Sequence, residues 1–228
     1  MTELTVEDRL LQAIALHVPF DGWSARAFDA AVADSGVDKT VARAHYPRGA
    51  VDLALAFHAR GDRAMIERLK SEDLSALRFR DRIAAAVRFR LEAVEDKEAV
   101  RRATTLFALP IHAADGAKAI WGTADAIWTA LGDTSDDVNW YTKRATLSGV
   151  YGSTVLYWLG DDSTGHQATW AFLDRRIDNV MQIEKAKAQM RDNPVLSKLM
   201  AGPNRLIQSI RRPADRTGFP GRWSGPGN

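Results

Sequence analysis

The chain contains no cysteine. Its 228 residues therefore form no disulfide, no thiolate metal site and no cysteine nucleophile, and the sequence says nothing of the redox state of its compartment. Long apolar runs are also absent. The longest uncharged stretch, residues 145–160, is shorter than the roughly 20 apolar residues of a spanning helix and contains three glycines. We expect no membrane-spanning helix.

The familiar catalytic motifs are missing as well. The sequence has no phosphate-binding Gly-x-x-x-x-Gly-Lys, no Gly-x-Ser-x-Gly, no His-Glu-x-x-His and no Glu-x-x-His. A di-iron hydroxylase built in a helical bundle needs Glu-x-x-His pairs, so this chain is not itself such an enzyme. The five histidines are far apart in the sequence and show no ligand spacing. We predict no catalytic residue, no metal site and no cofactor, and hence no enzyme.

The first eight residues carry three acidic side chains and lack the apolar segment of a secretory signal or the arginines of a transit peptide. This favours a cytoplasmic protein. The net charge of +2 is unevenly distributed. Residues 1–70 hold nine basic and ten acidic residues, whereas residues 185–228 hold nine basic and two acidic residues. An anionic partner is therefore expected to meet the C-terminal region.

Helical periodicity dominates the chain and alternating strand patterns are nearly absent, which predicts an all-α fold. A first helix is expected from about Val6 to His17, ending at Pro19. Later breaks are expected at Pro110, Gly116, Gly132 and residues 161–165. The remaining expected helices cover about residues 74–92, 97–109, 118–131, 140–159 and 167–189.

Residues 22–47 have the spacing of a helix-turn-helix. Ser24 caps its first helix, Gly36 supplies the turn and Asp38 begins the second helix. With the Tyr46-Pro47 pair that closes it, this unit resembles the DNA-binding head of TetR-type regulators. A DNA-reading function would place Lys39, Thr40 and Arg43 in a major groove, but this head is slightly acidic. We therefore predict no nucleic-acid binding.

The most distinctive segment is residues 132–144, which read Gly-Asp-Thr-Ser-Asp-Asp-Val-Asn-Trp-Tyr-Thr-Lys-Arg. Its last eight residues combine two aromatics, a carboxylate and two cations, a composition typical of a contact surface. Together with a later Trp-x-Phe-Leu-x-x-Arg beginning at Trp170, the segment resembles the Coq-nine family of ubiquinone-biosynthesis proteins. The Leu109-Pro110 pair matches another feature of that family, although a plain loop proline explains it equally well.

The resemblance implies a TetR-like all-α fold with an N-terminal helix-turn-helix and a C-terminal amphipathic helix. We divide the chain into a head (1–65), a lipid-binding helical domain (66–192), an amphipathic membrane-contact helix (193–212) and a disordered tail (213–228) rich in glycine and proline. TetR-like domains usually pair through their last helices, so a homodimer is expected.

Large aromatics alternate with small residues between about residues 100 and 180, which leaves room for an apolar ligand or simply lets helices pack closely. From the residues alone, a packed core is the better interpretation. The family resemblance favours a cavity for an isoprenoid lipid or ubiquinone precursor. The predicted lipid-binding residues are Phe107, Trp121, Trp128, Val150, Tyr151, Thr154, Tyr157, Trp158 and Phe172.

Two further surfaces follow from the same resemblance. Asp137, Trp140 and Tyr141 match positions that dock a hydroxylase, although Trp140 and Tyr141 could instead be core aromatics at a helix start. After Pro194, apolar residues recur at helical spacing among basic ones, a pattern typical of membrane-surface helices or of a helix packed on its own domain or a dimer mate. The predicted membrane-binding residues are Leu196, Lys198, Leu199, Met200, Arg205, Leu206, Ile207 and Ile210.

The family resemblance implies a non-catalytic accessory protein of ubiquinone biosynthesis. It would bind an isoprenoid lipid or quinone precursor and present it to a demethoxyubiquinone hydroxylase of the Coq-seven type. The expected location is peripheral, on the anionic inner face of a bacterial cytoplasmic membrane. The alternatives are a ligand-responsive TetR-type repressor and a lipid carrier without a protein partner. Operator binding and a specific hydroxylase complex would distinguish these functions.

Overall fold

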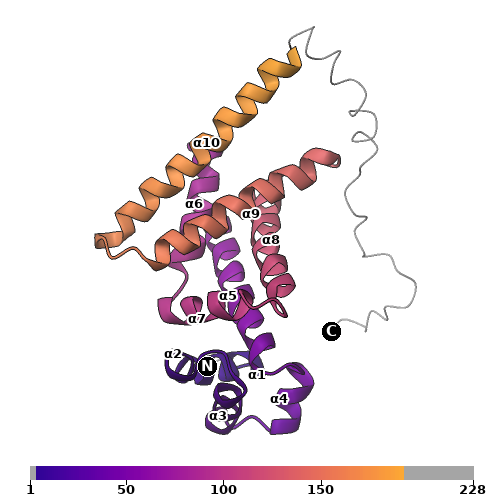
Figure 1. Ribbon diagram of the computed structural model, residues 1–228, viewed down its shortest axis with the longest axis vertical. Helices are drawn as coiled ribbons and strands as arrows, with labels where there is room; N and C mark the ends of the chain where they lie inside the picture. The colour runs from indigo at the N-terminus through magenta and orange to yellow at the C-terminus, as the bar shows by residue number, and fades with distance from the viewer. Residues whose placement is uncertain (1–3, 193–228) are drawn as a thin grey trace, which may run out of the picture.

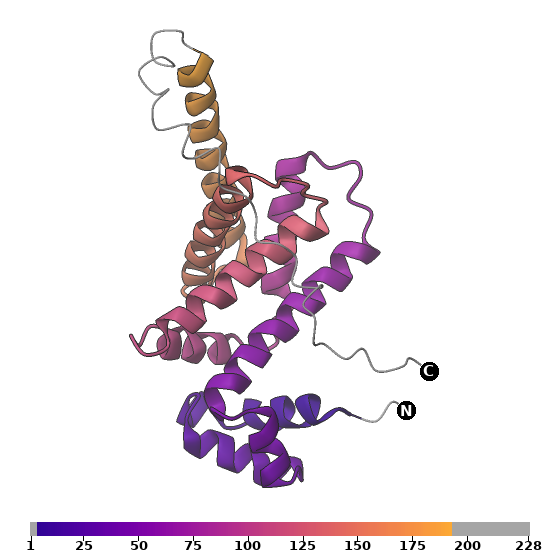
Figure 2. The same ribbon diagram turned by 90° about the vertical axis from the view of Figure 1, so that its right-hand side faces the viewer.

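The structure is a computed structural model that describes residues 4–192. This part of the chain forms ten α-helices, one short 3-10 helix and no strand, as the helical periodicity predicts. A small head at one end contains α1 (Val6–Ala15), α2 (Val18–Asp21), α3 (Ala25–Ser35) and α4 (Lys39–His45). Figures 1 and 2 show this head below a larger helical body, with α5 (Ala50–Ser71) running from one into the other.

The local sequence explains how the head helices begin and end. Thr5 caps α1 in a capping box with Asp8, and Ser24 accepts a hydrogen bond from the Ala27 amide at the start of α3. Asp38 accepts the Thr40 and Val41 amides at the start of α4. Gly36 ends α3 in the left-handed conformation, at φ +63°, where glycine carries no Cβ penalty. The predicted helix-turn-helix is therefore confirmed.

The body consists of α5 with α6 (Phe79–Glu92), α7 (Lys97–Phe107), α8 (Ala113–Ala130), α9 (Val138–Leu159) and α10 (Gln167–Asp192). The 3-10 helix η1 (Thr164–His166) connects α9 to α10. α9 packs against α8 and α10, and α5 packs against α6 and α8. The C-terminal part of α10 extends beyond the other helices in both views (Figures 1 and 2). Among residues 4–192, no helix is long and apolar enough to cross a bilayer.

Head and body have separate apolar cores. Leu10, Leu11, Ile14, Phe28 and Leu53 are among the fully or nearly fully buried residues of the head core. The body core is built around residues such as Met65, Val87, Ile127, Leu147 and Tyr151. α5 contributes to both cores and passes through the predicted boundary at residue 65 without interruption. The two cores are therefore joined by one continuous helix.

One expected break was wrong. The first helix ends at Ala15, before Pro19 as predicted, and Pro19 itself occupies the first turn of α2, where its missing N–H costs no hydrogen bond. Gly116 lies inside α8, which begins at Ala113 rather than near residue 118. A Cβ at Gly116 would stand 2.7 Å from the Cβ of Phe107, so this glycine allows α7 and α8 to approach closely. Helix α6 also begins later than expected, at Phe79.

A candidate lipid cavity and a patch at the start of α9

A cavity of about 500 Å³ lies between α5, α6, α7, α8 and α9, next to the head core, since Ala54 and Phe107 belong to or pack on that core and also line the cavity. This volume is within the range of small-molecule sites. Most of its wall is aliphatic or aromatic. The lining includes Ala54, Phe57, His58, Arg90, Leu91, Val94, Val100, Ala103, Thr104, Phe107, Ile120, Tyr151, Gly152, Val155 and Leu156.

The cavity opens between the C-terminal end of α7, the N-terminal end of α8 and one side of α9. Lining residues from all three helices, Ala108, Ala113, Ala117 and Leu156, are exposed to solvent. Leu156 is 62% exposed and also lines the cavity. A ligand longer than the cavity would extend through this mouth past Leu156.

One part of the wall, at His58 and Arg90, is polar. Arg90 bonds to Asp62 and His58 to Thr123, and neither partner is among the lining residues. The Arg90 guanidinium donates from Nε to Asp62 Oδ1 at 2.6 Å and from Nη2 to the His58 carbonyl at 2.9 Å. Thr123 Oγ1 donates to the same Asp62 oxygen at 2.9 Å and lies 2.8 Å from His58 Nε2. His58, Asp62, Arg90 and Thr123 are named the polar cluster below. A Cβ at Gly61 would overlap the Arg90 guanidinium, so a larger residue there would displace the guanidinium from its present position.

The polar cluster carries little net charge. Burial, assisted by the neighbouring Arg90 charge, lowers the pKa of His58 from 6.5 to about 4, so the imidazole is neutral at pH 7. Burial raises the pKa of Tyr151, whose ring lies edge-on to His58, and so keeps its hydroxyl protonated. The Arg90 cation and the Asp62 carboxylate compensate each other.

The second feature lies at the start of α9. Asp137 is the N-cap residue of this helix, and its side chain accepts hydrogen bonds from the Asn139 amide and the Asn139 side chain. The Trp140 ring lies 6.0 Å from Trp121 and 4.8 Å from Tyr141, measured between centroids. Trp140 and Tyr141 are both half-buried. Asp137, Trp140 and Tyr141 are named the α9 patch below.

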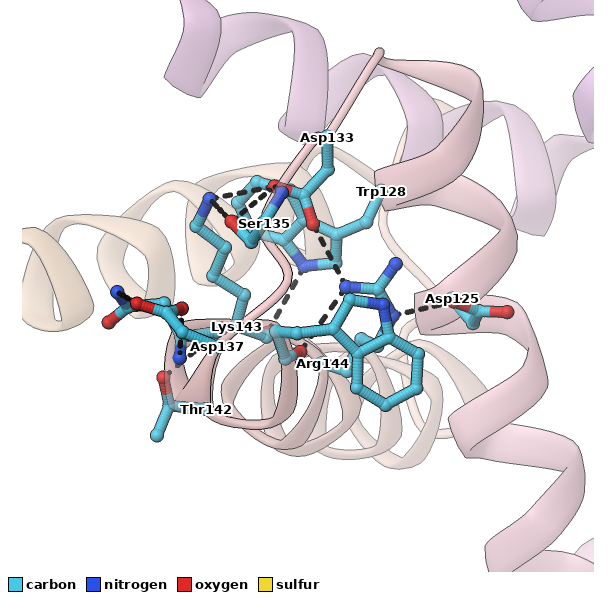
Figure 3. A network of polar contacts seen from close by, with 10 residues as sticks. Asp125, Trp128, Asp133, Ser135, Asp137, Thr142, Lys143 and Arg144 are labelled. Carbon is cyan, nitrogen blue, oxygen red and sulfur yellow. Dashed lines mark hydrogen bonds and ion pairs between the residues drawn. The ribbon is translucent and has the colours of Figure 1, made fainter. Parts of the chain in front are cut away.

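The two cations that follow the α9 patch both bond to Asp133, and only Arg144 is buried (Figure 3). Arg144 is 2% exposed and donates to Asp125 Oδ1 at 2.5 Å and to Asp133 Oδ2 at 2.9 Å. Lys143 donates to Asp133 Oδ1 at 2.7 Å, and its carbonyl accepts the indole N–H of Trp128. The Arg144 guanidinium also lies 4.1 Å from the Trp140 ring centroid. The Arg144 guanidinium therefore packs against the Trp140 ring.

This network has a clear electrostatic consequence for Asp133. Burial alone would raise the pKa of its carboxyl group. Hydrogen bonds from Lys143, Arg144 and Ser135 outweigh burial and hold the pKa well below its usual range. The carboxylate therefore stays ionised and holds both cations. Interpreting residues 137–144 as a contact surface was thus wrong for Arg144, which is buried.

The structure brings only some of the predicted lipid-binding residues together. Phe107 and Tyr151 line the cavity. The remaining seven lie outside its lining: Trp121 and Trp128 on α8, Val150, Thr154, Tyr157 and Trp158 on α9, and Phe172 on α10. Tyr157 stacks on Phe172 at 4.4 Å between centroids, and Trp158 is buried next to Lys97.

The predicted membrane-binding residues, from Leu196 to Ile210, lie outside the described residues, as do the predicted helix 193–212 and the tail. Sequence reasoning also missed the polar cluster. His58 and Asp62 show only the i, i+4 spacing found on any helix, and Arg90 is one of several arginines in α6. No sequence signal distinguishes that arginine from the half-buried Arg80 and Arg82 or the exposed Arg88 on the same helix.

The predicted DNA-reading residues are partly engaged within the head. Lys39 Nζ and Arg43 Nη2 lie 3.5 Å and 3.4 Å from the same oxygen of Asp29 on α3. Arg43 also lies over the Phe28 ring. Thr40 is exposed. In the described part of the chain, no group of three or more His, Asp or Glu residues is arranged to hold a metal ion.

The arrangement of head and body defines the class of fold. The structure is similar to a TetR transcriptional regulator from Nitrosomonas europaea, with a TM-score of 0.63 over 77% of this chain and 97% of that chain. The two sequences are 19% identical, so the similarity concerns the fold alone. The chain has a TetR-like all-α fold.

Sequence comparison identifies the family to which the chain belongs. The COQ9 family model matches residues 113–184, from α8 into α10. The chain is 30% identical to the ubiquinone biosynthesis protein COQ9-B of Xenopus laevis, over 83% of this chain and 67% of that protein. It is 32% identical to the COQ9 protein of Drosophila melanogaster, over 81% and 58%. The chain belongs to the COQ9 family, and the predicted family is confirmed.

The curated relatives are longer than the part matched here. The human COQ9 protein is 26% identical over 83% of this chain and 62% of its own length. The match to the fly protein spans 58% of that protein. These relatives are named as mitochondrial ubiquinone biosynthesis proteins.

Proposed function

We propose that this protein is a non-catalytic accessory factor of ubiquinone biosynthesis that binds an isoprenoid lipid or quinone precursor in the cavity. The observation that carries the proposal is the predominantly apolar cavity of about 500 Å³, open beside Leu156, in a member of the COQ9 family. An apolar wall with a few convergent polar groups suits a ligand with a hydrocarbon tail and a small polar head.

The same proposal gives the protein a partner. It presents its ligand to a membrane-associated hydroxylase of the Coq-seven type, and the α9 patch contributes to docking. Support comes from the half-buried Trp140 and Tyr141 rings, which contact each other, and from Arg144, which packs on the Trp140 ring and is held by Asp133. Half-buried aromatics on a rigid base are typical interface anchors. The proposed location is peripheral, on the inner face of a bacterial cytoplasmic membrane.

The cavity proposal is tested by filling the cavity. Gly152 lines the wall, and a Cβ there would lie 3.7 Å from Ile120, so Gly152→Trp places an indole in the cavity. Mass spectrometry of lipid extracts is expected to show at least tenfold less lipid with this variant than with wild type. Gly149→Trp is the matched control, because Gly149 is exposed on the same helix with nothing within 4 Å of its Cβ position. Equal lipid content in all three proteins, or none in wild type, contradicts the proposal.

The docking proposal is tested by removing the Trp140 ring. Trp140→Leu keeps an apolar side chain but loses the indole, so co-purification with the hydroxylase should fall at least tenfold. The control is Phe20→Leu, an aromatic substitution on α2 in the head, where Phe20 is 86% exposed. Unchanged hydroxylase recovery with a folded Trp140→Leu protein would rule out the α9 patch as a docking site.

A further inference from the structure

Helix α7 separates the head from the cavity, and Figure 1 shows it between the head and the rest of the body. Ala103 and Phe107 both pack on the head core and line the cavity. Ala99 belongs to the head core, whereas Val100 and Thr104 line the cavity. The position of α7 therefore sets the shape of the cavity.

The first half of α7 is attached to the head. The indole N–H of Trp23 donates to the Ala99 carbonyl at 3.0 Å, and the Trp23 ring lies 5.6 Å from the Phe57 ring between centroids. Trp23 is buried, and a hydrogen bond is electrostatically stronger inside a protein than in water. Arg102 Nη2 donates to the Pro19 carbonyl at 2.9 Å. Two polar contacts thus connect this half of α7 to the head.

The same half of α7 is also attached to the end of α9. Lys97 Nζ donates to the Asp161 carbonyl at 2.8 Å, and Arg101 Nη2 donates to the Leu159 carbonyl at 2.7 Å. Both acceptors lie where α9 ends, and the last carbonyls of a helix have no partner within it. The head and α9 therefore hold the first half of α7 from two sides.

The remainder of α7 and the loop after it, residues 104–111, are named the α7 end below. In the part of the chain that the structure describes, no side-chain hydrogen bond or ion pair joins the α7 end to another element. The hydroxyls of Thr104 and Thr105 donate to carbonyls of α7 itself. Residues 108–111 are exposed, and Leu106 and Phe107 make apolar contacts with the head core. Apolar contacts are non-directional, so the α7 end can move without breaking a polar contact.

The start of α8, on the opposite side of the cavity mouth, is held more firmly. Arg48 Nη1 donates to Asp115 Oδ2 at 2.7 Å, and its Nε donates to Asp52 Oδ1 at 2.8 Å. Asp115 lies in the first turn of α8 and Asp52 in the first turn of α5. Arg48 therefore connects α8 to α5, and the α7 end is the side of the mouth with fewer polar contacts.

We infer that the α7 end is a lid of the cavity, which turns about the fixed first half of α7 and opens between Phe107 and Gly116. Gly116 lets the lid close, since a Cβ there would stand 2.7 Å from the Cβ of Phe107. Trp23 holds the fixed end and is a positioning residue. The inference rests on the proposed function for the ligand that passes the lid, whereas the movement itself needs no ligand.

The first test closes the lid with a disulfide. The chain has no cysteine, so Phe107→Cys with Gly116→Cys introduces its only two thiols. The Cβ atoms of a disulfide are typically about 3.8 Å apart, so α7 and α8 need to separate by only about 1 Å. The reduced form of the same protein is the control, and wild type reports any effect of the reductant.

The probe is N-phenyl-1-naphthylamine, which becomes fluorescent in apolar surroundings. Stopped-flow fluorescence should give association and dissociation rates that are both at least tenfold lower in the oxidised than in the reduced form. The dissociation constant should stay nearly the same, because a lid changes the barrier to entry and exit. Gly152→Trp should abolish binding, which assigns the probe to the cavity. Equal rates in the oxidised and reduced forms overturn the inference.

A second test holds the lid open. Gly116→Ala places a methyl group against Phe107 and should raise the dissociation rate of the probe at least tenfold. Gly122→Ala is the matched control, because Gly122 is exposed on the same helix with nothing within 4 Å of its Cβ position. This variant should keep the wild-type rate. If the disulfide does not form, an unchanged rate in Gly116→Ala overturns the inference.

A third test loosens the fixed end. Trp23→Phe keeps an aromatic ring but loses the hydrogen bond to the Ala99 carbonyl, so the dissociation rate should rise at least threefold. Trp128→Phe is the matched control, since it loses an indole hydrogen bond to the Lys143 carbonyl, outside the cavity lining. Equal rates in these two variants contradict the role given to Trp23.

Hydrogen exchange tests the movement without a ligand. Oxidation of the cysteine pair should slow amide exchange in the α7 end at least tenfold relative to the reduced form and leave α6 unchanged. Equal exchange in the two forms overturns the lid, whatever the probe does. If no probe binds wild type but oxidation slows exchange, the proposed function loses its support and the lid remains.

Discussion

Two buried arginines in the body form similar ion pairs with aspartates but lie in different surroundings. Arg90 on α6 and Arg144 on α9 have side chains that are 5% and 3% exposed, and each donates Nε to an aspartate, at 2.6 Å and 2.5 Å. Arg90 has one carboxylate partner and faces a cavity. Arg144 has two, Asp125 and Asp133, and lies beneath the Trp140 ring.

The two arginines differ in the part of the structure that each ion pair stabilises. At Arg90, a single carboxylate leaves a polar but uncharged wall that a ligand can reach. At Arg144, Asp133 also holds Lys143, so the network fixes the first turns of α9 and the aromatic rings on them. Buried charges are stable only when compensated, so each network can be weakened by removing one carboxylate. The variants below use this dependence.

The largest effect is expected for Asp133→Ala. This change leaves Arg144 with one carboxylate and Lys143 with none, and removing a partner from a buried ion pair costs about 3–5 kcal/mol. The free energy of unfolding, measured by urea denaturation, should fall by that amount. Asp62→Ala should cost a similar amount, about 3–5 kcal/mol, because it removes the one carboxylate that contacts the buried Arg90. A loss below about 1 kcal/mol at either position would contradict the role given to these carboxylates.

An intermediate change in the free energy of unfolding is expected when the pH is lowered. The native pKa of His58, about 4, lies below the unfolded value of 6.5, so between these values the unfolded chain binds a proton that the native protein does not. The free energy of unfolding should therefore fall as pH drops from 6.5 to 4, with up to about 3 kcal/mol from this residue. Above pH 6.5 the contribution is constant.

The measurement is denaturation at several pH values with wild type and His58→Gln. The glutamine has no charge to gain, so the loss between pH 6.5 and 4 should be smaller in the variant. His45→Gln is the control, since His45 is exposed on α4. Identical pH profiles for wild type and His58→Gln would show that the imidazole is not buried next to Arg90.

The smallest effect is expected at Trp140. In Trp140→Leu, the Arg144 guanidinium loses the ring that it contacts at 4.1 Å but keeps both carboxylates. A cation–π contact of this kind contributes about 1 kcal/mol. Thermal or urea unfolding should therefore shift little, and the protein should remain folded for the docking assay. A loss comparable to that of Asp133→Ala would instead place Trp140 among the essential core residues.

Several local features were predictable from neighbouring residues. Ser24, Asp38 and Gly36 occupy the cap and turn positions expected of a helix-turn-helix, because capping depends on amides only two or three residues away. Gly116 shows the limit of this reasoning. It was expected to break a helix, whereas it lies within α8, where the Phe107 side chain of α7 leaves no room for a Cβ.

The sequence allowed a cavity in this region but did not identify the residues that line it. Alternation of large and small residues in α9 is compatible with either a packed core or a pocket, and only the packing of neighbouring helices decides between them. Tyr151 and Gly152 reach the cavity, while Val150 and Thr154 on the same helix are buried in the body. Their roles depend on which face of α9 meets α8 and which meets α10.

The sequence by itself determined the all-α fold and the head with its turn, because helix periodicity and helix caps depend on residues close together in the chain. It also determined the family, because the family motif is a continuous stretch of sequence. The tertiary structure decided the pairing of Arg90 with Asp62 and of Arg144 with Asp133. The carboxylate that neutralises each arginine comes from another segment of the chain, α5 for Arg90 and the turn before α9 for Arg144. Whether an arginine is buried or exposed therefore depends on where folding places its partner, and no local pattern carries that information.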